Sequence, residues 1–219
     1  MSQRQSRHTI GLILSNVTND FSGYLIEQME ELFTANGYKL LVTTTNHNID
    51  SERDMLTMFA DITDAILIIS DTASYTELEA SIPQDIPVIF LNRKPTGCPH
   101  TCIIENDYSA VFQAILSNSA SGNDKIGLVC SNPEFWDHLF FYNHDTDNPV
   151  TLIGFSNKHT HKLSLQSFDT IAQPLQELIE LAVQQTLYLI NTPDTPACEY
   201  LLKGTFRAHS LDIPAYDNK

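Results

Sequence analysis

The sequence is poor in basic residues and does not cluster them. Its 219 residues include 12 Lys plus Arg against 27 Asp plus Glu, which gives a formal net charge of −15. Binding to nucleic acid depends on grouped Lys and Arg side chains that displace counterions from phosphates, and anionic membrane surfaces attract the same side chains. We therefore expect that this chain binds neither nucleic acid nor a membrane by itself.

Cysteine is scarce and irregularly spaced, and long apolar runs are missing. Cys98, Cys102, Cys130 and Cys198 do not show the spacings of a disulfide scaffold, a redox motif or a zinc site. The first residues lack the apolar segment of a secretory signal, and no run approaches the length of a transmembrane helix. We expect reduced thiols in a cytoplasmic globular protein.

The motifs of the common enzyme classes are also lacking. The loop at residues 16–23 contains a single glycine, so it forms neither a phosphate-binding loop nor a dinucleotide fingerprint. A Gly-x-Ser-x-Gly nucleophile elbow does not occur. Histidines of the second half lack a carboxylate or thiolate at a metal-ligand spacing; they are His138, His144, His159 and His161. The sequence therefore predicts no enzyme, no metal and no cofactor.

What the first half does contain is an alternation of apolar runs and amphipathic segments. Runs typical of parallel strands covered on both faces lie at residues 8–15, 38–45, 64–70, 86–92 and 100–106. Between them, residues 24–37 and a segment opened by Asp50 place apolar side chains at helical spacing, and residues 76–81 are expected to form a short helix. Gly37 is expected to end the first helix. This order predicts an α/β fold with doubly wound parallel sheets.

The second half is less regular but repeats the same pattern. We expect strands at 125–131 and 150–156, helices at 109–119 and 175–190, a helix or irregular segment at 134–142, and a final strand at 199–210. Two lobes follow, with a linker stub at residues 1–7, an N-terminal lobe at 8–107 and a C-terminal lobe at 108–219. The prediction leaves open whether the final helix and strand cross back between the lobes.

Ligands bind such sheets at the carboxyl ends of the strands. That rule selects four loops, at residues 16–23, 70–74, 92–96 and 105–108. In the first, Asn19 and Asp20 offer hydrogen-bonding groups beside the apolar face of Phe21, and in the third Arg93 supplies a fork of donors. Together they suit a polyhydroxylated or heteroaromatic ligand. The alternatives are that Phe21 packs under the first helix and that Arg93 pairs with a surface acid.

Several segments carry a family resemblance. In chain order they are HTIGLILSNVTNDFSGYLIEQMEELFTANGYKLLVTTTNHNIDSERDML, DAILIIS, IPVIFLNR, IIENDYSA, VTLIGF and FDTIAQPLQELIELAV. This order resembles the effector-binding core of the LacI/GalR family of bacterial transcription regulators, whose two-lobe fold is shared with periplasmic sugar-binding proteins. The closing FRAHS favours the regulators. The chain is short between Lys125 and Gly154, so the resemblance implies a reduced second lobe over 108–219.

The resemblance also implies a set of ligand contacts. The family's Asn-Pro-Phe, Asp-Arg, Asp-Asn and Gly-Phe-Asp patterns correspond here to Asn19-Asp20-Phe21, Asn92-Arg93, Asn106-Asp107 and Gly154-Phe155-Ser156. Ser156 thus replaces an acid that often receives sugar hydroxyls. The expected ligand-binding residues are Asn19, Asp20, Phe21, Ser70, Arg93, Asp107 and Ser156.

The implied function is the effector-binding and dimerisation core of a LacI-type DNA-binding regulator. Such a core senses a small sugar-like or purine-like molecule by lobe closure, forms a homodimer and acts in the cytoplasm. DNA contact is expected only through a helix-turn-helix headpiece, which we expect this chain to lack because it begins almost at the first core strand. Two alternatives stay open: a ligand-independent dimerisation or protein-interaction module, and a solute-binding protein of the sugar-binding type.

Overall fold

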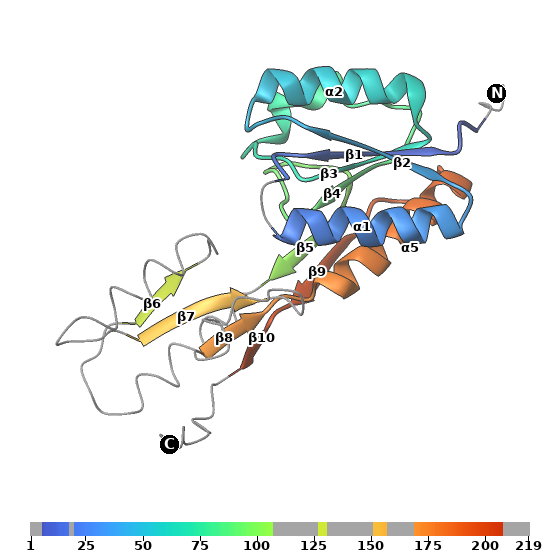
Figure 1. Cartoon of the computed structure of the whole chain (residues 1–219). Coiled ribbons are helices and arrows are strands. Elements are labelled where there is room, and N and C mark those ends of the chain that lie inside the picture. The colour runs from blue at the N-terminus through green and yellow to red at the C-terminus, as the bar shows by residue number, and fades with distance from the viewer. Residues whose placement is uncertain (1–5, 18–19, 107–126, 131–150, 157–168, 208–219) are drawn as a thin grey trace. The chain divides into compact units, whose positions relative to one another are not determined.

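A computed structural model describes residues 6–17, 20–106, 127–130, 151–156 and 169–207. The chain divides into two compact units, of which the first comprises Met1–Asn106 and Pro174–Leu202 and the second Asp107–Gln173 and Lys203–Lys219. The described strands form two sheets, one of six strands and one of four. The first three strands alternate with helices, and most of the described strand pairs are parallel (Figure 1), which confirms the predicted α/β class.

The six-stranded sheet belongs to the first unit. Its strands are β1 (Thr9–Leu14), β2 (Lys39–Thr44), β3 (Ala65–Ile68), β4 (Val88–Leu91), β5 (Thr101–Asn106) and β9 (Glu199–Lys203). They lie in the order β2-β1-β3-β4-β5-β9, and the pairs from β2 through β5 are parallel. The five strands predicted in the first half are therefore confirmed, and their carboxyl ends lie at one edge of the sheet.

Helices cover both faces of this sheet. Helices α1 (Asp20–Ala35) and α5 (Leu175–Asn191) lie on one face and α2 (Ile49–Ile62) on the other (Figure 1). Side chains of a strand alternate between the faces, so Leu12 joins the core formed with α1 and α5 while Ile13 joins the core formed with α2. Both faces of the central strands are thus buried, which explains their continuous apolar sequences.

Gly37 ends α1 as predicted. Its φ is 81°, a left-handed conformation that glycine adopts without the clash that a Cβ would bring. The Gly37 N–H donates to the Thr34 carbonyl at 3.0 Å, and the Tyr38 N–H donates to the Phe33 carbonyl at 2.9 Å. This pair of hydrogen bonds is a Schellman motif, which satisfies carbonyls that the helix end would leave without partners.

The start of α2 differs from the prediction. The segment predicted as helical opens at Asp50, whereas α2 begins at Ile49 and its N-cap is Asn48. The Asn48 side chain accepts hydrogen bonds from the N–H groups of Asp50 and Ser51 at 2.9 and 3.0 Å. Asparagine and aspartate cap equally well, so the residue types alone did not distinguish the two positions.

Two other elements also differ from their predicted form. Residues 76–81, expected as one short helix, form the consecutive 3₁₀ turns η1 (Tyr75–Glu77) and η2 (Glu79–Ser81), because so few residues cannot stabilise an α-helix by themselves. The single final strand predicted at 199–210 is divided at Gly204. Its first part is β9, and its second part, β10 (Thr205–Arg207), belongs to the other sheet.

The four-stranded sheet lies in the second unit. Its strands β6 (Gly127–Cys130), β7 (Thr151–Ser156), β8 (Asp169–Ala172) and β10 follow the order β10-β8-β7-β6. The pairs β6–β7 and β7–β8 are parallel, whereas β10 and β8 are antiparallel. Strands β6 and β7 match the prediction and β8 was not predicted. The segments at 109–119 and 134–142 lie outside the described residues, and among the described helices none is long and apolar enough to cross a bilayer.

Phe59 of α2 packs across β1 at Gly11, where no side chain intervenes. A Cβ added at Gly11 would lie 2.3 Å from Phe59 Cδ2, and Phe59 is buried, so its ring would have to shift within the core. We expect Gly11→Ala to lower the free energy of unfolding by about 1–3 kcal/mol, as overpacked cores do. The midpoint of urea unfolding, followed by circular dichroism, measures the effect.

Gly23→Ala is the matched control. Gly23 lies in α1, and a Cβ there would meet nothing within 4 Å. Because alanine favours a helix over glycine by up to about 1 kcal/mol, the control is expected to keep or raise the midpoint. Equal losses in the two variants would contradict close packing at Gly11.

Candidate functional site

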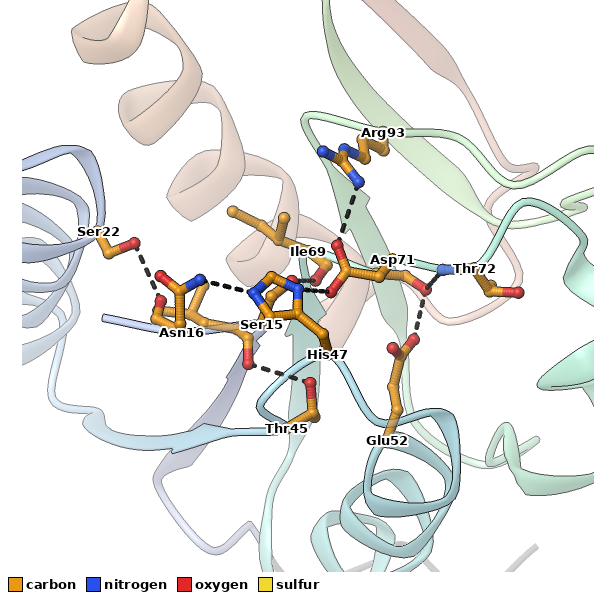
Figure 2. Close-up of polar contacts among 12 residues, drawn as sticks. Ser15, Asn16, Ser22, Thr45, His47, Glu52, Ile69, Asp71, Thr72 and Arg93 are labelled. Carbon is orange, nitrogen blue, oxygen red and sulfur yellow. Dashed lines mark hydrogen bonds and ion pairs between the residues drawn. The ribbon is translucent and has the colours of Figure 1, made fainter. Parts of the chain in front are cut away.

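A chain of polar contacts runs along the carboxyl edge of the six-stranded sheet (Figure 2). The Asn16 Nδ2 atom lies 2.9 Å from His47 Nε2, and His47 Nδ1 lies 2.7 Å from Asp71 Oδ2. The Arg93 Nη1 group then donates to Asp71 Oδ1 at 3.1 Å. These residues follow β1, β2, β3 and β4 respectively, so the contacts connect the ends of four neighbouring strands.

Asp71 is the centre of these contacts. One carboxylate oxygen faces His47 and the other faces Arg93, and the side chain of Asp71 is 26% exposed against 61% and 62% for its two partners. Because the Asn16 amide nitrogen can only donate, His47 Nε2 accepts and its Nδ1–H donates to Asp71. The acid therefore fixes both the orientation of the imidazole ring and its tautomer.

The backbone that carries His47 adopts a rare conformation. Asn46 and His47 have φ values of 50° and 59°, in the left-handed region that costs most residues about 1 kcal/mol or more. Asparagine and histidine are enriched among the exceptions. Such a conformation persists where its surroundings hold it, and here the contacts with Asn16 and Asp71 hold the ring.

A buried carboxyl lies beneath this edge. Glu52, in the first turn of α2, is 3% exposed, and it accepts hydrogen bonds from the Ser70 hydroxyl and from the backbone N–H of Asp71. Burial raises the pKa of Glu52 above its ordinary value, the two hydrogen bonds oppose that rise, and the nearby Asp71 carboxylate adds to it. Glu52 thus anchors the loop that presents Asp71.

Arg93 is held in a tight turn directly after β4. Asn92 has a φ of 62°, its N–H donates to the Ile103 carbonyl at 2.8 Å, and the Arg93 N–H donates back to the Leu91 carbonyl at 2.7 Å. This i to i+2 bond is a γ-turn with positive φ, a strained form. The turn directs Arg93 toward Asp71 while the guanidinium remains open to solvent.

Three of the predicted site residues have described side chains. Phe21 is half-buried in the first turn of α1 and packs against the core shared with α5, Ser70 is fully buried and donates to Glu52, and Arg93 pairs with Asp71. Asn19 and Asp107 lie outside the described residues. Asp20 begins α1 and Ser156 ends β7, but their side chains are not described. A ligand contact by any of the seven stays a prediction.

The sequence alone did not identify several residues of the polar contacts at this edge. Asn16 and Asp71 lie in two of the four selected loops but were not singled out. His47 lies after the second strand, in a loop that the same carboxyl-end rule would also have selected. Glu52 lies in the predicted helix that opens at Asp50 and was not singled out either. Its burial depends on the loop after β3, which its position in a helix does not reveal.

Glu52→Gln is expected to change how stability depends on pH. Because the folded state raises the pKa of Glu52 from 4.5, the folded chain binds more protons than the unfolded chain between the two pKa values. The contribution of Glu52 to stability is therefore present below pH 4.5 and decreases as pH rises to the folded pKa. The free energy of unfolding of Glu52→Gln, relative to wild type, is expected to increase across that window and then level off.

Urea unfolding at intervals from about pH 4 to about pH 8 measures this difference. Glu30→Gln, at an exposed position of α1, controls for the removal of one negative charge. Wild-type and Glu52→Gln curves that stay parallel over the whole range would show that burial does not affect the ionisation of Glu52.

Known proteins similar to the chain are bacterial regulators. No protein-family model matches it. The HTH-type transcriptional regulator GalR of Salmonella typhimurium (strain LT2) is 26% identical over 130 residues, which are 59% of this chain and 38% of GalR. The sucrose operon repressor of Streptococcus mutans is 24% identical over 266 aligned positions, covering 95% of this chain and 83% of the repressor. The chain thus spans well under half the length of GalR. These relatives are regulators and not enzymes.

Solved structures agree in fold. A periplasmic binding protein/LacI transcriptional regulator from Alkaliphilus metalliredigens, complexed with D-xylulofuranose, has a TM-score of 0.77 at 17% identity, over 93% of this chain and 99% of that one. The Cra regulator of Pseudomonas putida, in complex with fructose 1-phosphate, has a TM-score of 0.72 at 18% identity with the same coverage. The homologues of this chain are therefore transcriptional regulators of the LacI/GalR family, and its fold is that of their effector-binding core.

Proposed function

We propose that this chain is the effector-binding and dimerisation core of a LacI-type transcriptional regulator that senses a small sugar-like or purine-like molecule in the cytoplasm. The regulators that it resembles in sequence include a sucrose operon repressor. Two proteins of the same fold were solved with D-xylulofuranose and with fructose 1-phosphate. The match covers 38% of GalR, so the activity of a complete regulator is part of this proposal.

The polar cluster at the carboxyl edge of the first sheet is the observation that carries this proposal. His47, Asp71 and Arg93 place an imidazole, a carboxylate and a guanidinium at neighbouring strand ends. Sugar hydroxyls both donate and accept hydrogen bonds, so they suit a site that offers both functions. The guanidinium, an obligate donor, suits a ring oxygen, a hydroxyl or a purine acceptor.

Ligand binding would act through a shift in conformation. A ligand changes the balance between two conformations only by its difference in affinity for them, and here the strand-end loops supply the contacts that would differ. In this proposal DNA is contacted by a helix-turn-helix headpiece and not by this chain, whose charge of −15 repels phosphates.

A panel of sugars, sugar phosphates and purines, scored by thermal unfolding, tests the proposal. A true effector at about 100 times its dissociation constant adds about 2.7 kcal/mol to the free energy of unfolding, so we expect one class to raise the melting temperature by several degrees. Arg93→Ala is expected to weaken that ligand about 10- to 100-fold, because a hydrogen bond to a charged group contributes about 1.5–3 kcal/mol. No response to any member of the panel would count against the proposal.

Two variants sharpen the assignment of the site. Arg7→Ala removes another exposed arginine, next to the amino end of β1, and is expected to leave affinity unchanged. Asp71→Asn keeps the shape of the side chain but weakens its hold on His47 and Arg93, and is expected to lower affinity while the fold remains. If Arg7→Ala and Arg93→Ala reduced affinity equally, the ligand would not be at the carboxyl edge.

The proposed homodimer has a separate test. Met58 and Ile62 lie one helical turn apart on α2 and are 44% and 43% exposed, which supports an apolar contact between two copies. Light scattering after size exclusion is expected to give twice the monomer mass, and Met58→Asp combined with Ile62→Asp is expected to give the monomer. Tyr188→Asp, at an exposed aromatic residue of α5 on the opposite face of the sheet, is the control.

The dimer measurement also distinguishes the alternative function. A stable dimer that responds to no ligand would favour a ligand-independent protein-interaction module, whereas a wild-type monomer would contradict the dimerisation part of the proposal.

A further inference from the structure

Three of the four cysteines come together where β5 begins. Cys98 lies in the connection from β4 to β5, and Cys102 is the second residue of β5. The Cys102 N–H donates to the carbonyl of Cys198 at 2.9 Å, so the segment before β9 lies beside them. Cys98 and Cys102 are buried free thiols, whereas Cys198 is exposed.

Cys98 and Cys102 are in direct contact with each other. Their Sγ atoms are 3.8 Å apart, with Cys102 as hydrogen-bond donor and Cys98 as acceptor. A disulfide requires a separation of about 2.05 Å, so the two sulfurs need to approach by less than about 2 Å. Cys98 is 8% exposed and Cys102 is 0% exposed; a small solute therefore reaches Cys98 first.

The surroundings shift the pKa values of the two thiols in opposite directions. The hydrogen bond from Cys102, the N–H of His100 and the Lys94 ammonium together lower the pKa of Cys98 to about 7, against the effect of burial. The pKa of Cys102 is raised by its interaction with Cys98 and by burial. Inert buried cysteines do not have a lowered pKa, whereas a thiol near a cation commonly does.

Lys94 is itself held in place close to the pair. Its ammonium forms an ion pair with Glu199 of β9, and the Glu199 carboxylate raises the pKa of Cys102 further. On another side, the His100 ring contacts Tyr75, whose hydroxyl is 2.8 Å from His100 Nε2. Burial lowers the pKa of His100 and so disfavours the charged form of this imidazole.

We propose that Cys98 and Cys102 form a peroxide-oxidisable dithiol, whose disulfide joins the connection that also carries Arg93 to the start of β5. The Cys98 thiolate attacks one oxygen of hydrogen peroxide, the O–O bond breaks, and hydroxide leaves and takes up a proton to become water. Cys98 is then a sulfenic acid. Cys102 attacks its sulfur, the S–O bond breaks, and the hydroxyl leaves with the Cys102 proton as a second water. Two thiols lose two electrons and one peroxide becomes two waters.

The chemistry of this pair does not depend on the proposed effector. It needs only the thiol contact and the neighbouring charge, which are features of the first unit alone. If no ligand of the panel bound, the dithiol proposal would still stand. If the thiols were not oxidised, the proposed effector-binding function would still stand.

Mapping the oxidised cysteines by mass spectrometry tests the proposal. The folded chain is treated with hydrogen peroxide near pH 7, its free thiols are blocked, and its peptides are mapped. We expect a Cys98–Cys102 disulfide that dithiothreitol reverses, in wild type and in the control Cys198→Ser alike. In Cys102→Ser we expect Cys98 to stop at the sulfenic acid, which dimedone captures.

Lys94→Gln tests the role of charge without removing a thiol. Because the Lys94 ammonium helps to lower the pKa of Cys98, its removal is expected to reduce the thiolate fraction at pH 7 and to slow oxidation. Unfolding in urea removes the surroundings that lower the pKa of Cys98, so oxidation of Cys98 is expected to slow there. Pairing through Cys198 or Cys130, unreacted Cys98, or equally fast oxidation of Cys98 in the unfolded chain would each overturn the proposal.

Discussion

Burial of the central strands on both faces determines where polar groups can be placed in the first unit. The side chains of β1, β3 and β4 are enclosed between α2 on one side and α1 and α5 on the other. A polar group inside this arrangement would lose its hydration without a partner. Polar side chains therefore gather where the strands end, and the register of the sheet brings these ends together. The same constraint explains both the apolar sequences of the strands and the location of the candidate site.

At that edge, the buried acid Glu52 supports the partly exposed acid Asp71. Glu52 holds Ser70 and the backbone of Asp71 from below, and Asp71 in turn holds His47 and Arg93. A solvent-exposed pair such as Arg93 with Asp71 contributes little to stability by itself. Its value lies in orienting the guanidinium before a ligand arrives, which reduces the entropy that binding would otherwise cost.

The sequence predicted those parts of the molecule that depend on local pattern. Two-sided strands, amphipathic helices and the glycine that ends α1 each leave a periodic or single-residue signal, and the structure confirms them. The contacts of Asp71 with His47 and Arg93 leave no such signal, because they join residues 24 and 22 positions apart and depend on which strands are neighbours. The division of the last strand at Gly204 was likewise missed, since alternation of side chains continues across it and only the pairing partner changes.

The discontinuity of the two units has a consequence for synthesis. The chain passes from one unit to the other after Asn106, after Gln173 and after Leu202. Helix α5 supplies Leu178, Ile179 and Ala182, all fully buried, to a core whose members outside α5 lie before residue 104, apart from Leu202 of β9. A nascent chain that ends before α5 would leave exposed to water the part of that face that α1 does not cover, with the aggregation risk that exposed apolar surface brings. The first unit can therefore complete its fold only after the segment that interrupts it has been made, so its long-range contacts form late.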